Sequence, residues 1–346
     1  MNKTILITGA AGFFGRILTQ HCLNQGFNCI GIDIEPMDVT HHNLTFFQAD
    51  ITNKSSCSNI FAQYGIDGVV HCAALLAHLV KDKQRLWHAN VEGTRYLIEL
   101  CKQFNVSSFI YISSNCLWGH NFHRPVTEQD IPKPVEIYGE SKWAAEQVLE
   151  PYKDDINIII FRCPTIIDEG RLGLLSILFE FIYENRSIWV LGGGKNKYQF
   201  IYAKDFAVAC VKALSYPKSS IFNIGSDHVK SFKAVYQAVI NKANTRSTIK
   251  SLPKSPMLVL MRIAYWLKLS PLGPYQYKMI AEDFIFDTTK IKTELNWKPT
   301  LTNEDMLFKS YNYYHQNITQ INQRTNVSAH RQTAKMGLIR LLKWLS

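Results

Sequence analysis

The sequence predicts an α/β protein with a doubly wound parallel sheet, followed by a smaller C-terminal region. Short runs rich in β-branched and aromatic residues alternate with longer segments of helical spacing, as in βαβ units. The run at 156–161 is almost entirely apolar, which is typical of a strand covered on both faces. The expected strands are 3–8, 28–34, 44–48, 67–72, 108–113 and 156–162, and the clearest expected helices are 14–25, 84–104 and 139–152.

The regular alternation ends near residue 165, where glycine turns begin to separate more irregular segments. We therefore expect residues 1–165 to form one domain, with strands near 200–225 rejoining its sheet. Residues 166–315 are expected to form a smaller second region, and 316–346 a linker followed by a basic amphipathic tail.

A glycine-rich turn, T-G-A-A-G-F-F-G at 8–15, links the first expected strand to the first expected helix. Gly9 would permit the tight turn, Gly12 would let the backbone approach a pyrophosphate, and Gly15 would allow close packing of the helix on the strand. The helix N-terminus would add amide donors and a positive dipole end for phosphate. The strand before the turn and the helix after it favour a dinucleotide site over a purely structural turn.

An acidic residue, Asp33, ends the second expected strand, 18 residues after Gly15. A carboxylate at this position can accept hydrogen bonds from the hydroxyls of an adenosine ribose, and it would repel a 2′-phosphate. No lysine or arginine follows within several residues. The sequence therefore favours NAD over NADP, the alternative being that Asp33 is a turn or helix-cap aspartate.

A tyrosine and a lysine stand four residues apart in Y-G-E-S-K at 138–142, at the start of an expected helix. This spacing puts Tyr138 and Lys142 on one helix face. An ammonium beside a phenol favours the phenolate and lowers the tyrosine pKa from about 10. The tyrosine then becomes a usable general acid and base. The same spacing also occurs in exposed helix pairs.

Several further motifs stand in a fixed order along the chain. They are A-D-I at 49–51, H-C-A-A at 71–74, N-V-E-G-T at 90–94, Y-I-S-S at 111–114, R-C-P at 162–164, F-N-I-G at 222–225 and L-N-W-K-P at 295–299. Together with the glycine turn and the Tyr-Lys pair, they resemble the extended short-chain dehydrogenase/reductase family, in particular its NAD-dependent nucleotide-sugar epimerase/dehydratase branch. The resemblance covers roughly residues 3–315 and implies a Rossmann domain for NAD in 1–165 and substrate binding in 166–315.

The resemblance also implies a role for individual residues. Ser114, Tyr138 and Lys142 match the family's catalytic trio, in which the serine hydrogen-bonds the reacting oxygen, the tyrosine transfers the proton and the lysine holds the nicotinamide ribose. The implied cofactor-binding residues are Gly9, Gly12, Phe13, Phe14, Gly15, Asp33, Asp50, Ile51, Cys72, Ala73, Ala74, Asn90, Tyr138, Lys142 and Pro164. The implied substrate contacts are Ser114, Thr165 and Tyr198.

The implied reaction is hydride transfer between a sugar hydroxyl carbon and NAD, with a nucleotide sugar as the small-molecule substrate. An epimerase returns the hydride to the other face, whereas a dehydrogenase releases the ketone. Dehydratases of the family carry an Asp-Glu pair directly after the catalytic serine or threonine, but here Asn115 and Cys116 follow Ser114, which disfavours dehydration.

The resemblance weakens where the family binds the substrate diphosphate. An arginine is usual at the position of Tyr198, and only Lys195 and Lys197 stand nearby. A lysine provides a point charge but lacks the bidentate fork of arginine. A second family arginine is also replaced, with Lys278 as the nearest base. The alternative substrate is therefore a lipid-linked sugar or another hydrophobic alcohol, oxidised by an NAD-dependent dehydrogenase at a membrane surface.

The apolar stretch 257–272 could support that alternative, but we expect it to be a core helix of the second region. In the tail, Leu338, Leu341, Leu342 and Leu345 share one helical face with basic residues elsewhere, as in a segment that lies on anionic lipid. Packing of the tail on the protein's own body, or on a second subunit in a homodimer, is an equal expectation.

The composition narrows the function classes further. The eight cysteines show no metal-binding spacing, so we expect buried free thiols and no metal site. No secretory pattern precedes the first expected strand, so we expect a cytoplasmic enzyme, at most peripheral to the inner face of a membrane. Of the net charge of +10, six charges follow Asp305, which leaves +4 on the body. This distribution argues against nucleic-acid binding. A non-catalytic NAD sensor would not need Ser114, Tyr138 and Lys142.

Overall fold

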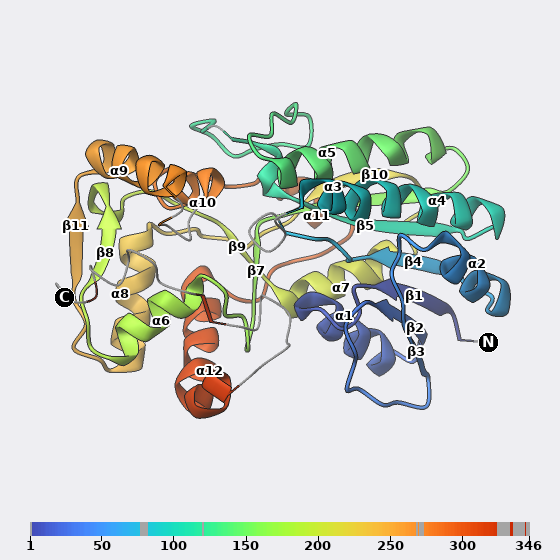
Figure 1. Ribbon diagram of the computed structural model, residues 1–346, viewed down its shortest axis with the longest axis horizontal. Coiled ribbons are helices and arrows are strands. Elements are labelled where there is room, and N and C mark those ends of the chain that lie inside the picture. Colours follow the sequence, from blue (N-terminus) through green and yellow to red (C-terminus); the bar gives the residue numbers. More distant parts are fainter. Residues whose placement is uncertain are drawn as a thin grey trace.

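The computed structural model describes residues 2–76, 82–119, 121–267, 269, 273–323, 333–334 and 343. Its centre is a parallel seven-stranded sheet with the order β10-β6-β5-β4-β1-β2-β3 (Figure 1). The strand order reverses between β1 and β4, which creates the switch point where doubly wound sheets bind ligands. The strands are β1 (Thr4–Thr8), β2 (Asn28–Asp33), β3 (Leu44–Gln48), β4 (Gly68–His71), β5 (Ser108–Ser114), β6 (Asn157–Cys163) and β10 (Ser220–Asn223).

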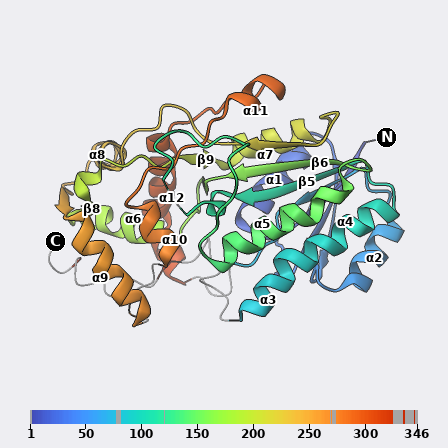
Figure 2. The same ribbon diagram turned by 90° about the horizontal axis from the view of Figure 1, so that it is seen from above.

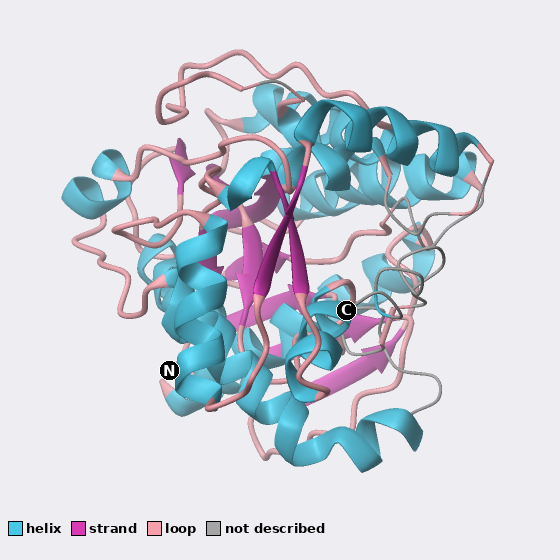
Figure 3. Ribbon diagram, turned by 90° about the vertical axis from the view of Figure 1, so that its left-hand side faces the viewer, coloured by secondary structure: helices cyan, strands magenta, loops and turns pink. Residues whose placement is uncertain are grey.

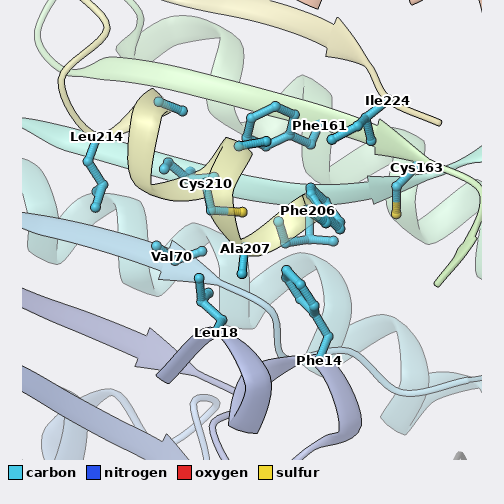
Figure 4. Packing of buried hydrophobic residues seen from close by; sticks show 14 of the residues in the cluster. Phe14, Leu18, Val70, Phe161, Cys163, Phe206, Ala207, Cys210, Leu214 and Ile224 are labelled. Atoms are coloured by element: carbon cyan, nitrogen blue, oxygen red, sulfur yellow. The ribbon is translucent and has the colours of Figure 1, made fainter. Parts of the chain in front are cut away.

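Helices cover both faces of this sheet (Figures 1 and 2). On one face lie α1 (Phe13–Asn24), α7 (Ala203–Ala213) and α11 (Thr289–Glu294). On the other lie α2 (Lys54–Gln63), α3 (Lys83–Trp87), α4 (Gly93–Gln103) and α5 (Ile137–Leu149). Figure 4 shows the first of these layers, in which Phe14 and Leu18 of α1 and Phe206 and Cys210 of α7 pack together against the strands. The apolar residues of the central strands are thus buried from both sides, as the sequence predicts.

The C-terminal region lies at one end of the large sheet (Figure 1) and is seen in front of that sheet in Figure 3. It contains two small parallel sheets, β7 (Thr165–Ile167) with β9 (Phe200–Tyr202), and β8 (Ile188–Leu191) with β11 (Ile249–Leu252). Its helices are α6 (Leu175–Tyr183), α8 (Phe232–Ala243), α9 (Lys254–Trp266), α10 (Pro274–Met279) and α12 (Asn303–Gln323). Short 3₁₀ turns η2 (Asn115–Leu117), η3 (Glu150–Tyr152) and η4 (Gly192–Gly194) complete the described elements.

Several segments from residues 166–315 pack as part of the first domain. Strand β10 joins the large sheet beside β6, and α7 packs on α1. Trp297 is buried in the same apolar cluster, and its indole Nε1 donates to the carbonyl oxygen of Asp205 at 2.8 Å. Residues 166–315 therefore do not form one continuous unit. Strand β10 belongs to the large sheet, and α7, α11 and Trp297 cover one face of it.

Three sequence-based expectations need correction. The segment 84–104 is not one regular α-helix, since a π-helical turn η1 (His88–Glu92) separates α3 from α4. The expected linker after residue 315 is partly helical, because α12 continues to Gln323 past a non-helical residue, Asn317. The expectation of a core helix at 257–272 is wrong: α9 buries only Ala264, and most of its large apolar side chains are exposed.

The leucines of the expected amphipathic tail, Leu338, Leu341, Leu342 and Leu345, lie outside the described residues. Lys343 is described and pairs with Glu180 and Glu184 of α6. All eight cysteines are free thiols. Within the described ranges, no helix combines the length and the hydrophobicity that crossing a bilayer requires.

Candidate active site

A cavity of about 490 Å³ opens at the carboxyl ends of β1, β2, β4, β5 and β6 and extends toward the C-terminal region. Loops that follow these strands form its walls, as expected at the switch point of a doubly wound sheet. The sequence-predicted residues that line it are Gly9, Gly12, Phe13, Phe14, Gly15, Asp33, Asp50, Ile51, Cys72, Ala73, Ala74, Ser114, Tyr138, Lys142, Pro164 and Thr165. Two predicted residues, Asn90 and Tyr198, do not line it.

The glycine turn has no space for side chains. Gly9 has a φ of 68°, and a Cβ there would lie 2.8 Å from the amide nitrogen of Ala73. A Cβ on Gly15 would lie 1.9 Å from the carbonyl oxygen of Gly9, so α1 can approach β1 only without one. Helix α1 begins directly after Gly12, which has no side chain to cap the amides of the first turn. These amides face a site suited to an anion.

Asp33, the last residue of β2, lines the cavity at the end that holds the glycine turn. Its carboxylate accepts hydrogen bonds from the amides of Ala11 at 2.9 Å and Glu35 at 3.0 Å. Burial raises the pKa of Asp33, and the backbone donors around it oppose that rise. Each carboxylate oxygen can accept a further bond, so the position suits the hydroxyls of a ribose. Asp50 and Ile51 line the same end.

Ser114, Tyr138 and Lys142 converge on the cavity from β5 and α5. The Ser114 hydroxyl accepts a hydrogen bond from the amide of Cys116 at 3.1 Å, which leaves its own proton to donate. Lys142 donates to the carbonyl oxygen of Ile112 at 2.8 Å, and its ammonium lies 4.6 Å from the ring centroid of Tyr111. The first bond uses one of the three ammonium protons, so the others remain for a ligand.

The electrostatics of the trio differ from the expectation. We expected Lys142 to lower the pKa of Tyr138, but burial raises the pKa of Tyr138 well above its usual range. The positive charge that opposes this rise comes from Arg171. Burial also lowers the pKa of Lys142 to about 8 and that of Arg171 to about 10. The site is thus a desolvated pocket that disfavours charge on each of these groups.

Asn90 does not line the cavity but is hydrogen-bonded to a residue that does. It lies in the π-helical turn η1 and bonds both backbone groups of Leu75, accepting at 2.7 Å and donating at 3.0 Å. It also donates to Ser141 Oγ at 3.0 Å, and that hydroxyl donates to the carbonyl oxygen of Tyr138 at 2.8 Å. Asn90 therefore ties the loop after β4 to the first turn of α5 and is a positioning residue.

The substrate side of the cavity also differs from the expectation. Tyr198 is buried among aromatic rings, and its hydroxyl accepts a hydrogen bond from Asn115 Nδ2 at 2.6 Å. Lys195 and Lys197 are not among the residues of the cavity wall either. Four charged residues that the sequence did not single out do line it, namely Arg171, Glu136, Arg85 and Glu35. For two of these residues, position in the sequence is the signal that could have identified them. Arg171 stands seven residues after Pro164, and Glu136 stands two residues before Tyr138.

A dinucleotide cradle beside a Ser-Tyr-Lys group defines an NAD-dependent enzyme of the extended short-chain dehydrogenase/reductase type. The model of the NAD dependent epimerase/dehydratase family matches residues 5–225, and the chain belongs to that family.

Relatives extend the similarity beyond the matched segment. The uncharacterized protein y4nG of Sinorhizobium fredii is 34% identical over 344 residues, which are 99% of this chain and 86% of that protein. The UDP-glucuronate 4-epimerase of Thermodesulfobacterium geofontis is 26% identical over 346 residues, covering 91% of this chain and 97% of that one. The crystal structure of a UDP-glucuronic acid 4-epimerase from Bacillus cereus in complex with NAD is 25% identical, with a TM-score of 0.71 over 90% of this chain and 99% of that chain.

Proposed function

We propose that this protein epimerises a nucleotide sugar, with Tyr138 as the proton carrier at the reacting sugar hydroxyl. The observation that carries the proposal is that Ser114, Tyr138 and Lys142 line the same cavity as the glycine turn and Asp33. In this proposal residues 1–165 hold NAD together with the returning strand β10. The C-terminal region, beginning with the loop after Pro164, holds the sugar nucleotide.

The cradle fits NAD because Gly9 and Gly15 leave no room for side chains and Asp33 suits a ribose diol. When bound there, NAD supplies the hydride acceptor and donor. The chain supplies the proton handling. Tyr138 takes the proton from the sugar hydroxyl as its carbon is oxidised, and returns it when the carbonyl is reduced. Ser114 donates its free hydroxyl proton to the same substrate oxygen.

Because the pocket is desolvated, Tyr138 needs nearby positive charge to lower its pKa before it can accept a proton. Its pKa lies well above the usual range in the structure, so the phenolate must be favoured by positive charge. Arg171 already lowers the pKa of Tyr138. Lys142 stands one helical turn away and stays an ammonium below a pH of about 8. In this proposal Lys142 holds the ribose beside Tyr138, and Arg171 provides the positive charge that the substrate side lacks at Lys195 and Lys197.

The residues that follow Ser114 favour epimerisation over dehydration as the proposed reaction. Asn115 and Cys116 line the cavity, but neither side chain has a carboxyl group, so the acidic pair that eliminating water requires is missing. Two of the relatives named above are 4-epimerases of UDP-glucuronate, and a further relative, from Lacticaseibacillus casei, is a UDP-glucose 4-epimerase. UDP-glucose and UDP-glucuronate are therefore the first substrates to test.

The test is conversion of UDP-glucose or UDP-glucuronate to the C4 epimer by the purified protein with NAD, followed by NMR. Tyr138→Phe should lower kcat by about 10²- to 10⁴-fold and still bind NAD, since it removes only the proton carrier. Tyr216→Phe is the matched control, because this phenol lies outside the cavity and bonds Glu294. Turnover of Tyr138→Phe at the wild-type rate would refute the assignment.

A further inference from the structure

Helix α9 exposes an apolar face that the proposed reaction does not use. Met257, Leu258 and Met261 are half-buried and Ala264 is buried, so these four residues form the side that faces the body. On the other side, Trp266 is 80% exposed. Five more large apolar side chains are about half exposed: Val259, Leu260, Ile263, Tyr265 and Leu267.

The exposed apolar residues form one continuous stripe. Positions 263, 266 and 267 lie four, seven and eight residues after 259, and 260 lies three residues before 263, which is the spacing of a single helix face. The helix is therefore apolar toward the body and apolar toward the outside. Large contiguous apolar patches on a protein surface usually mark an interaction site.

The surroundings of the stripe are positively charged. From His228 to Ala281 the sequence has no aspartate or glutamate, but it has nine basic residues. Lys230 and Lys242 are neutralised by Glu304 and Asp305. Lys254 and Arg262 lie exposed on α9 itself, and Lys250 lies exposed on β11 just before it. The helix therefore carries positive charge next to its apolar stripe.

We propose that α9 docks on the surface of an anionic membrane, with the stripe inserted among the acyl chains and the basic residues at the lipid headgroups. Apolar residues on one face, tryptophan and tyrosine at one end, and basic flanks are the features of helices that lie in the bilayer interface. The 13 residues of α9 span only about 20 Å, which is shorter than a hydrocarbon core of about 30 Å, so the helix lies along the surface.

A second copy of the chain fits this face less well. A two-fold interface through α9 would place the stripe against itself, and Lys254 and Arg262 would meet their own copies or each other. The stretch 228–281 offers no carboxylate to offset that repulsion. An anionic lipid surface provides the missing negative charge.

Docking would orient the active site. Helix α9 leads into α10 and packs against it, and Gln276, Met279 and Ile280 of the α10 segment line the cavity. The substrate end of the cavity would then lie near the lipid surface. The docking proposal does not depend on the proposed reaction, since it rests on α9 alone.

The experiment is co-sedimentation of the full-length protein with two kinds of vesicle. One contains phosphatidylcholine alone, and the other contains phosphatidylcholine with about one-third phosphatidylglycerol. We expect binding to the anionic vesicles and a decrease with added salt. Ile263→Asp with Trp266→Asp, and separately Lys250→Glu with Lys254→Glu, should each weaken binding by more than about tenfold.

The control is Ile131→Asp, which places a carboxylate on another exposed apolar residue, 72% exposed and outside α9. It should bind as the wild type does. Retained NAD affinity shows that each variant is folded. Absence of vesicle binding by the wild type, or equal binding by the α9 variants, would overturn the proposal. So would a dimer that Ile263→Asp with Trp266→Asp dissociates in analytical ultracentrifugation, because a second copy would then cover α9.

Discussion

Glu146→Gln should destabilise this protein strongly, because it breaks a buried ion pair behind the active site. Glu146 of α5 and Arg162 of β6 are each 2% exposed. Arg162 Nη2 donates to Glu146 at 2.7 Å, and its Nε lies 3.2 Å from both carboxylate oxygens. Ser113 donates to the same carboxylate at 2.5 Å. The amide in Glu146→Gln keeps the shape but leaves the buried guanidinium without its counter-charge.

The expected loss is about 3–5 kcal/mol of unfolding free energy, the usual result when one partner of a buried pair is removed. Arg162 keeps its bond to the carbonyl oxygen of Glu128 and its contact with the Trp118 ring, neither of which carries a negative charge. The matched control is Asp155→Asn, which breaks a pair of similar length with Lys102 at 2.6 Å. Its partners are 57% and 46% exposed, so the loss should be only a small fraction of that in Glu146→Gln.

Urea unfolding at pH 7, followed by circular dichroism, gives both values. Replacing both partners, as in Glu146→Leu with Arg162→Met, should recover most of the loss, because no buried charge then remains unpaired. Glu146→Gln within about 1 kcal/mol of the wild type would refute the reasoning, since it would mean that water reaches the guanidinium.

Two further predictions concern the sheet end that holds the glycine turn. Gly15→Ala should weaken NAD binding severely and lower the free energy of unfolding by about 1–3 kcal/mol, because the new Cβ would lie 1.9 Å from the Gly9 carbonyl oxygen. Calorimetric titration measures the NAD affinity, and urea unfolding measures the stability. The control is Gly65→Ala, whose Cβ enters open space and which should change neither quantity. Burial lowers the pKa of His71 to about 3, below its unfolded value of about 6.5. The unfolded chain therefore binds the extra proton as the pH falls through 6.5, and stability should drop by about 2 kcal/mol by pH 5. Urea unfolding at pH 7 and pH 5 tests this, and a His71→Gln variant with the same loss would contradict it.

The sheet and the cofactor end could be predicted because local signals determine them. Strands covered on both faces leave long apolar runs, and the predicted strands appear in the structure within a few residues. The glycine turn is equally local, since Gly9 and Gly15 are required by contacts within one strand-turn-helix unit. Tyr138 and Lys142 share a helix face, so their approach to one wall follows from spacing alone.

The substrate side could not be predicted, because it depends on contacts between distant segments. Tyr198 was expected in the cavity, but its hydroxyl bonds Asn115, 83 positions away in the chain. Arg171 gains its place from the fold of the segment between β7 and α6, for which the sequence shows no motif. The exposure of α9 is a similar case: a helix that is apolar all round reads as a core helix, and only the packing of its neighbours shows which face remains uncovered.

The precision of the proposed reaction depends on how firmly α5 is held against β5, because Tyr138 and Lys142 come from the helix and Ser114 from the strand. Three contacts fix this relation. Lys142 itself bonds the carbonyl oxygen of Ile112, the Asn90–Ser141 bond holds the first turn of α5, and Glu146 holds Ser113, the residue next to Ser114. The buried ion pair therefore supports the reacting groups without touching the cavity. Since a displacement of about 1 Å can cost a reaction about a hundredfold, a variant of Glu146 that still folds should lose kcat while its NAD affinity, set by the other end of the sheet, is retained.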